Sequence, residues 1–320
     1  MHYIIAGASG LVGQALLREL QQHSQDSSDH HPDAADLKIT LLSRSEAKLN
    51  KLKSRFADLT AQGFTYRQLQ EIIKKTPAPA PDNPHPVLDL NGAVFINLAG
   101  ESIAKKRLGN ARLQELLSSR LAVINLCQEL IKAGCGTPAL FVQAGSLSIL
   151  RDDDIEQDGS ETAGHAIAGI LKQLEAAVRE LPCPALILRL PIVLSENALF
   201  CRLLRTLPPI ALLDGSNYLP AASVRDCARA LLFSAEHHLT GAINVSPPSY
   251  FTARALLKAA AGEHRLLPPM PVLRLMLRLA ALFDLRALLL LENKKVRAQR
   301  LTGLGFKFEH LTLEACLSSH

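Results

Sequence analysis

The sequence contains no tryptophan, and aromatic residues make up only 4% of its 320 residues. Leucine and alanine must therefore fill the core, which suits helices packed on a sheet better than an aromatic-rich β-sandwich. Hydrophobic residues account for 48% of the chain and charged residues for 20%, as in ordinary soluble globular proteins. The composition predicts a sizeable buried core in one large or two modest domains.

Cysteine pairs with metal-ligand spacing are also missing. The six cysteines lie apart, mostly in apolar segments, at Cys127, Cys135, Cys183, Cys201, Cys227 and Cys316. We expect them to be small buried residues in a reducing compartment. The pair His30–His31 lies in the polar stretch 23–36, for which we predict an exposed loop without a metal site.

A basic tail is missing as well, because the net charge of +5 is spread along the chain. Neither a run of lysines and arginines nor interleaved aromatic residues accompany this charge, so nucleic acid is not an expected partner. The apolar N-terminus lacks the basic region of a signal peptide, and glycines interrupt its hydrophobic run. We therefore expect a cytoplasmic protein.

The most hydrophobic segment, residues 271–291, contains four charged residues, Arg274, Arg278, Asp284 and Arg286. Each central charge would cost about 2.5–3.5 kcal/mol inside a bilayer, so we predict no membrane span. The three arginines recur at multiples of four and share one helical face. The segment is predicted to be a docked helix or helix pair, with a subunit interface or a membrane surface as minor options.

A glycine turn stands close to the start of the chain. Residues 1–6 have the pattern of a short apolar strand, and Gly7-Ala-Ser-Gly-Leu-Val-Gly13 leads from it into a helix. This order is typical of a phosphate-binding unit, in which the anion lies on free N–H groups at the helix N-terminus. Gly7 would allow a sharp turn, Gly10 the approach of a pyrophosphate, and Gly13 close packing of helix on strand. The spacing differs from G-x-G-x-x-G, so a glycine-rich surface turn is the alternative.

A second signal lies at the end of the next predicted strand, residues 37–42, which runs into Ser43 and Arg44. In dinucleotide folds an acidic residue here accepts the ribose hydroxyls of NAD, whereas an arginine accommodates the 2′-phosphate of NADP. The position holds no carboxylate, so NADP(H) is favoured over NAD(H). A solvated arginine at a helix start is the alternative.

Helices and strands are predicted to alternate over the following residues. We expect helices at 46–57, 110–133 and 161–180, and strands at 64–69, 93–100, 139–144 and 185–194. A proline-rich loop, 77–86, lies between them. Alternation of this kind predicts an α/β protein with a doubly wound parallel sheet and right-handed crossovers.

Five segments together form a recognisable set: Gly7–Gly13, Asn97–Glu101, Ser119–Arg120, Leu188–Leu194 and Arg300–Phe308. They resemble the atypical, extended short-chain dehydrogenase/reductases, in particular the NAD(P)-dependent epimerase or nucleoside-diphosphate-sugar epimerase-like subgroup with a short C-terminal domain. The resemblance covers almost the whole chain apart from residues 23–36. It implies a Rossmann domain at 1–195, whose sheet is completed by part of 218–246, and a smaller, mainly helical C-terminal substrate lobe at 196–320.

The resemblance also implies which residues bind the cofactor. The pyrophosphate would lie on Gly7, Ser9, Gly10, Leu11 and Val12, with Gly13 in the same turn. The 2′-phosphate would lie near Arg44, with Ser43 beside it, and the adenosine side near Leu98, Ala99 and Gly100. Pro191, within the segment Leu188–Leu194, completes the expected cofactor site.

The catalytic half departs from the family pattern. Extended short-chain dehydrogenases use a tyrosine and a lysine four residues later as acid/base pair, and this chain has Ile167 and Leu171 there. His165 and Lys172 lie close by without the required spacing, and we expect a structural or solvated role for each. Ser146 or Ser148 could supply a hydroxyl, and Ser146 is the catalytic candidate, with a turn or capping role as the alternative.

The expected rim of the substrate pocket has changed too. A Trp-Ile-His segment typical of the subgroup appears as Ala221-Ala-Ser223, with only Asp226 retained after it. Two functions stay open. One is an NADP(H)-dependent oxidoreductase or epimerase-like enzyme acting on a small molecule, such as a sugar or nucleotide-sugar. The other is a catalytically silent NADP-binding sensor or regulatory partner, and for either one a homodimer is an option.

Overall fold

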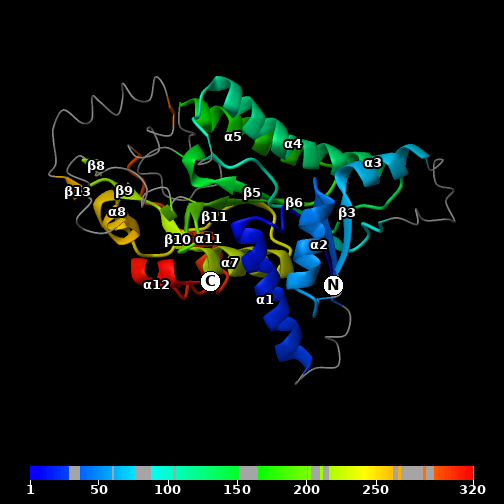
Figure 1. Cartoon of the computed structure of the whole chain (residues 1–320), viewed down its shortest axis with the longest axis horizontal. Helices are drawn as coiled ribbons and strands as arrows, with labels where there is room; N and C mark the ends of the chain where they lie inside the picture. The colour runs from blue at the N-terminus through cyan, green and yellow to red at the C-terminus, as the bar shows by residue number, and fades with distance from the viewer. Residues whose placement is uncertain are drawn as a thin grey trace.

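Figure 1 shows the computed structural model of the chain, with a central sheet between two layers of helices. The structure describes residues 1–28, 37–59, 61–75, 88–103, 106–150, 165–199, 201–202, 210–211, 216–261, 266–267, 284–285 and 292–319. The predictions for the histidine pair at 30–31, for the proline-rich loop 77–86 and for nearly all of the segment 271–291 lie outside these residues.

The central sheet contains seven strands in the order β11-β6-β5-β4-β1-β2-β3. Every neighbouring pair is parallel, which confirms the predicted doubly wound sheet. The strands are β1 (His2–Ala6), β2 (Lys38–Ser43), β3 (Ala61–Thr65), β4 (Ala93–Asn97), β5 (Leu140–Ser146), β6 (Ala185–Leu190) and β11 (Gly241–Asn244). All five residues of β4 are buried, as the middle strand of a sheet covered on both faces requires.

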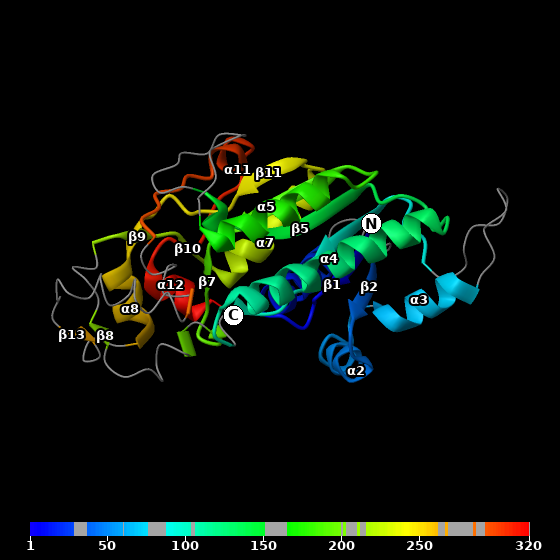
Figure 2. The ribbon, with the colours of Figure 1, turned by 90° about the horizontal axis from the view of Figure 1, so that it is seen from above.

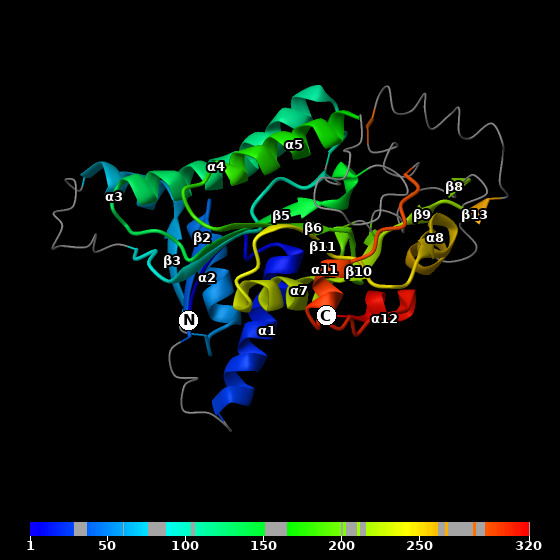
Figure 3. The same cartoon turned by 180° about the vertical axis from the view of Figure 1, so that it is seen from behind.

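Helices cover both faces of the sheet because successive strand side chains point in opposite directions. Tyr3 and Ile5 of β1 pack in one core, with helices α1 (Leu11–Ser28), α2 (Glu46–Arg55) and α7 (Val224–Glu236). Ile4 and Ala6 pack in the other core, with α3 (Tyr66–Lys75), α4 (Asn110–Lys132) and α5 (Ala166–Arg179). Figure 3 shows α3, α4 and α5 above the sheet and α1, α2 and α7 below it.

Short elements lie at one end of the sheet. They are η3 (Leu147–Ile149), β7 (Ile192–Leu194), β8 (Ile210–Ala211), β9 (Tyr218–Leu219), β10 (Ala221–Ser223), β12 (Phe251–Thr252), α8 (Ala253–Ala261), β13 (Leu266–Leu267), α11 (Gln299–Gly303) and α12 (Leu313–Ser318). A third core joins Leu194, Leu219, Phe251, Leu256 and Cys316. Figure 2 shows α8 at this end and α3 at the other. The predicted boundary between residues 195 and 196 stays a prediction.

Several predicted boundaries of helices and strands were wrong. The first helix continues to Ser28 through part of the predicted loop, because residues 23–28 contain neither glycine nor proline. The strand predicted at 64–69 is the end of β3 followed by α3, whose buried Leu69 belongs to a helical pattern. The strand predicted at 185–194 is interrupted at Pro191, which has no N–H for a ladder.

Among the residues that the structure describes, every helix is either too short or too polar to cross a lipid bilayer.

Candidate functional site

The glycine turn lies where the strand order reverses, between β1 and β4. Gly7 has a φ of +87°, and its carbonyl accepts a hydrogen bond from Gly10 N at 2.9 Å. A Cβ on Gly7 would lie 2.5 Å from Ala99 N, so a side chain has no room where the turn meets the segment after β4. A Cβ on Gly13 would lie 2.6 Å from Ala8 Cα, which agrees with the predicted close packing of helix on strand.

The turn leads directly into the N-terminus of helix α1. Ser9 and Gly10 are exposed, and Leu11 and Val12 are half-buried. Gln14 N donates to Gly10 O at 2.9 Å, and the amides before this first bond have no partner within the helix. The first turn of α1 contains no acidic residue, so its positive dipole end is not offset by a carboxylate. This arrangement suits a phosphate group.

Arg44 lies directly after β2 on the same edge of the sheet. Its guanidinium donates to Glu101 Oε1 at 2.8 Å, and 65% of its side chain is exposed. The hydroxyl of Ser43 accepts a hydrogen bond from Ser45 N at 3.2 Å and so shapes the same turn. Arg112 approaches the other carboxylate oxygen of Glu101 at 3.2 Å. Hydrogen bonds from both arginines lower the pKa of the Glu101 carboxyl to about 2.

The side chain of Asn97, the last residue of β4, fixes the segment that follows the strand. Asn97 Oδ1 accepts from Ala99 N at 3.1 Å, while Asn97 Nδ2 donates to Gln143 Oε1 of β5 at 2.8 Å. These bonds fix Leu98 and Ala99 beside Gly7, where a Cβ on Gly7 would meet both. The predicted segment 98–100 and the glycine turn therefore lie together.

The pair Ser119–Arg120 belongs to the same site. Ser119 Oγ accepts from Glu101 N at 3.1 Å, and the Arg120 guanidinium lies over Gly100, where a Cβ would approach its Cζ to 2.7 Å. Arg120 also donates to Leu116 O at 2.9 Å. Sequence reasoning assigned no role to Glu101, Arg112 or Arg120. The only signal was that two of the five motif segments contain Glu101 and Arg120.

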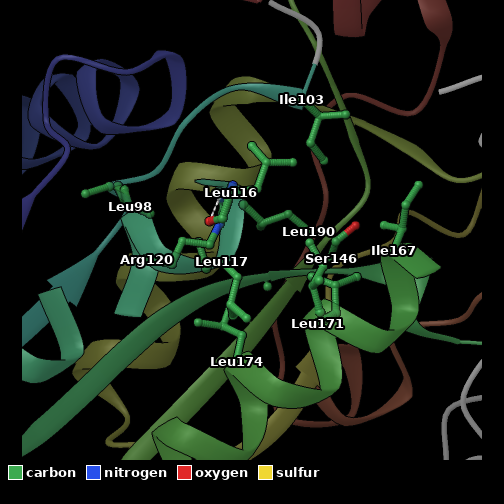
Figure 4. A pocket seen from close by; sticks show the side chains of 14 residues that line it. Leu98, Ile103, Leu116, Leu117, Arg120, Ser146, Ile167, Leu171, Leu174 and Leu190 are labelled. Carbon is green, nitrogen blue, oxygen red and sulfur yellow. Dashed lines mark hydrogen bonds between the residues drawn. The ribbon is translucent and has the colours of Figure 1, made fainter. Parts of the chain in front are cut away.

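A cavity of about 170 Å³ lies next to this segment, between α4 and α5. Figure 4 shows its lining, with Arg120 on the side of Leu98 and Ser146 on the side of Ile167. The lining residues are Leu98, Ala99, Ile103, Leu116, Leu117, Arg120, Ala144, Gly145, Ser146, Ile167, Ile170, Leu171, Leu174 and Leu190. Pro191 follows Leu190 at the end of β6 and interrupts the strand beside this cavity.

The positions of the missing dyad, Ile167 and Leu171, both line this cavity. Ser146 lines it as well, and its Oγ accepts from Ser148 N at 3.2 Å, which is the predicted capping role. Lys172 is exposed. His165 caps α5 by accepting from Ala168 N at 3.1 Å, and its Nε2 lies 3.6 Å from Glu292 Oε1.

The rim segment around Ser223 is tied to the C-terminal part of the chain. The buried carboxylate of Asp226 accepts from the backbone amides of Glu309 at 3.0 Å and His310 at 2.9 Å. His310 Nδ1 also lies 3.1 Å from Ser223 Oγ. His310 therefore joins the segment around Ser223 from a part of the chain that is 87 positions away in the sequence. Asp226 also pairs with Arg229 at 3.0 Å, so its role here is structural.

A parallel sheet with a glycine turn at the point where strand order reverses defines the class of dinucleotide-binding Rossmann proteins. No family model matches the chain. The chain is 27% identical over 244 residues to the epimerase family protein SDR39U1 of Mus musculus, covering 70% of this chain and 80% of that protein.

Solved structures show the same likeness. Human epimerase family protein SDR39U1 (isoform 2) with NADPH superposes with a TM-score of 0.69 at 21% identity, covering 99% of this chain and 97% of that one. UDP-glucuronic acid 4-epimerase from Bacillus cereus in complex with NAD has a TM-score of 0.64 at 13% identity, covering 100% and 97%. The chain therefore shares its fold with these epimerase structures and is similar in sequence to an epimerase family protein.

Proposed function

We propose that this chain is an NADP(H)-binding oxidoreductase of the extended short-chain dehydrogenase type, related to the epimerases and acting on a small carbonyl-bearing or sugar-like molecule. The observation that carries the proposal is the placement of Arg44 beside the glycine turn on one edge of the sheet. The relative solved with NADPH supports the same choice of cofactor.

The residues present fit a dinucleotide. The backbone at Gly7 and Gly13 leaves no room for a Cβ, so the turn stays narrow and a phosphate can approach the first amides of α1 closely. These amides and the start of α1 would hold the pyrophosphate. Arg44 would bind the 2′-phosphate, for which a guanidinium provides two parallel donors. Leu98 and Ala99 would form the wall on the adenosine side.

When bound, a nicotinamide cofactor supplies hydride transfer, and the protein supplies orientation and the proton. Ile167 and Leu171 have no titratable group, so these two residues of the cavity lining cannot relay a proton. Ser146 is the hydroxyl of the cavity lining, and it would hold a substrate oxygen or relay a proton to it. A cytoplasmic location and a homodimer remain predictions.

Cofactor binding is tested by thermal unfolding with NADPH and with NADH. A ligand that binds only the native state raises the free energy of unfolding, by about 2.7 kcal/mol at a ligand concentration of a hundred times Kd. The melting temperature rises as a result. We expect a larger rise with NADPH. No rise with either cofactor would refute the proposal.

Catalysis is tested separately, with NADPH and a panel of carbonyl compounds and nucleotide-sugars. Ser146→Ala should lower kcat and leave the NADPH-induced rise in melting temperature unchanged, because Ser146 lies away from the glycine turn. Full NADPH binding without turnover on the whole panel would instead favour the silent sensor.

A further inference from the structure

Lys294 is a buried lysine to which the proposed function gives no role. Only 1% of its side chain is exposed, and its Nζ lies 3.3 Å from Glu292 Oε1 and donates to Leu147 O at 3.4 Å. Replacing a buried ion pair by apolar side chains of similar size is often neutral or stabilising, because each buried charge has lost its hydration. Packing alone therefore does not explain a lysine at this position.

The segment 292–298 holds Lys294 in place. Its backbone runs beside β9, where Lys294 N donates to Tyr218 O at 2.8 Å. The side chains alternate along the segment, so that Lys294 and Val296 are both buried. Val296 belongs to one small core with Leu147 of η3. The buried face of this segment therefore lies against the turn that follows Ser146.

A single peptide group connects Lys294 with Ser146. The carbonyl that accepts from Lys294 belongs to Leu147, and the N–H of the same peptide group belongs to Ser148. That N–H donates to Ser146 Oγ at 3.2 Å. Because the peptide group is conjugated, a cation at its oxygen draws electrons from its nitrogen and makes the N–H a stronger donor. The charge of Lys294 therefore acts on Ser146 Oγ through two hydrogen bonds.

Ser146 lies in the lining of the cavity between α4 and α5, as Figure 4 shows. The bond from Ser148 uses a lone pair of Oγ, so the hydroxyl proton can still be donated to a molecule in the cavity. A hydroxyl that accepts a strong hydrogen bond is itself a stronger donor, because hydrogen bonds in a chain polarise one another. The bonds of this chain then all point in one direction, from Lys294 into the cavity.

We propose that Lys294 is a positioning residue for Ser146, and that it strengthens the serine hydroxyl as a donor to a substrate oxygen. Glu292 compensates the buried charge of the lysine by pairing with it. Lys294 is not among the lining residues that the structure describes, so it acts through the peptide group between Leu147 and Ser148. The effect on a substrate rests on the proposed function, whereas the chain of hydrogen bonds does not.

Nuclear magnetic resonance tests this chain without a substrate. In protein with isotope labels on leucine carbonyls and serine nitrogens, the five Leu-Ser pairs of the sequence give separate signals, and Ser148→Ala removes the one in question. Lys294→Met keeps the length of the side chain without its charge. We expect it to move the Ser148 amide proton upfield, because the bond to Ser146 weakens. Lys295→Met is the matched control, since this exposed neighbour lies over the Tyr218 ring and should leave the signal unchanged.

Lys294→Arg separates charge from shape. Arginine keeps the charge, so the Ser148 signal should stay close to its wild-type position, whereas methionine resembles lysine in shape and should move it. The other four Leu-Ser signals report on the rest of the fold and should not move in either variant. If Lys294→Met moves several signals, its packing has changed, and Lys294→Arg decides. An unmoved Ser148 signal in Lys294→Met, or a signal that Lys294→Arg does not retain, would overturn the proposal.

Turnover tests the consequence for catalysis, with a compound that the panel shows to be a substrate. Lys294→Met should lower kcat about two- to tenfold, because cooperative strengthening adds only about 10–30% to a hydrogen bond. The NADPH-induced rise in melting temperature should stay unchanged. In the Ser146→Ala background the same substitution should have no further effect, since the lysine acts through the serine hydroxyl. An equal loss in both backgrounds would mean a merely structural role and would contradict the proposal.

This proposal and the proposed function can fail separately. If no compound of the panel is turned over but Lys294→Met still moves the Ser148 signal, the proposed catalysis fails and the chain of hydrogen bonds stands. If the wild type turns over a substrate but Lys294→Met changes neither the signal nor kcat, the role of Lys294 is wrong and the proposed function stands.

Discussion

Arg44 donates a 2.8 Å hydrogen bond to Glu101, a residue 57 positions away in the sequence. The same carboxylate accepts from Arg112 at 3.2 Å, so Glu101 connects the end of β2 with the first turn of α4. Arg44 is thereby directed across the edge of the sheet towards the segment after β4. A 2′-phosphate bound there would meet a guanidinium already held in place.

Replacing Arg44 by glutamine should weaken NADPH binding about 10- to 100-fold and leave NADH binding unchanged, because only NADPH has the 2′-phosphate. Stability should change by less than about 1 kcal/mol, since 65% of the Arg44 side chain is exposed and water weakens its ion pair with Glu101. Fluorescence titration of each cofactor measures this, with Arg67→Gln at an exposed ion pair on α3 as control. Equal loss for both cofactors would contradict the assignment.

The low pKa of Glu101 predicts a specific dependence of stability on pH. Its folded pKa of about 2 lies below its ordinary value of 4.5, so its contribution is fully present above pH 4.5 and is lost towards pH 2. Urea unfolding at pH 7, 4 and 3 should show wild type more stable than Glu101→Gln at pH 7. The difference should shrink as the pH falls, and a difference independent of pH would refute the prediction.

The Gly13→Ala substitution should destabilise the protein and impair NADPH binding. Its Cβ would lie 2.6 Å from two backbone atoms, Ala8 Cα and Gly7 O, which cannot move aside. We expect a loss of about 1–3 kcal/mol, as for other overpacked sites. Gly169→Ala is the control because nothing lies within 4 Å of its Cβ, and in helix α5 it should stabilise by up to about 1 kcal/mol. Similar results for both would be inconsistent with a narrow turn.

The buried pair of Glu175 on α5 and Arg189 on β6 fixes the helix to the sheet beside the cavity. Arg189 donates to the two carboxylate oxygens at 2.8 and 2.9 Å, and both side chains are buried. Arg189→Leu leaves a buried carboxylate with only the exposed Arg179, so we expect a loss of about 3–5 kcal/mol in urea unfolding. Arg67→Leu, at an exposed pair, should cost less than about 1 kcal/mol. If Arg189→Leu costs no more than this control, the buried pair does not hold the helix.

The sequence predicted the local parts of this protein well. The strand, turn and helix around Gly7 and Gly13 arise from neighbouring residues, so their order alone indicated a phosphate-binding unit. The segment 64–69 was misread because a short apolar run fits either a strand or a buried helix, and only packing of Leu69 against its neighbours decides between them.

The cavity lay beyond sequence reasoning for a different reason. Its walls come from segments near residues 98, 116, 146, 167 and 190, and no local pattern states that these meet. The absence of the tyrosine and lysine was visible in the sequence. The sequence did not show that their replacements, Ile167 and Leu171, line the same cavity as Arg120.

By itself the sequence determined the fold class, the glycine turn and the presence of an arginine after the second strand, because each depends on residues close together in the chain. Only the tertiary structure decided that Glu101 holds Arg44, and that Arg120 lines an apolar cavity. These relationships join residues far apart in the chain, and they exist only once the parallel strands bring their carboxyl ends to one edge.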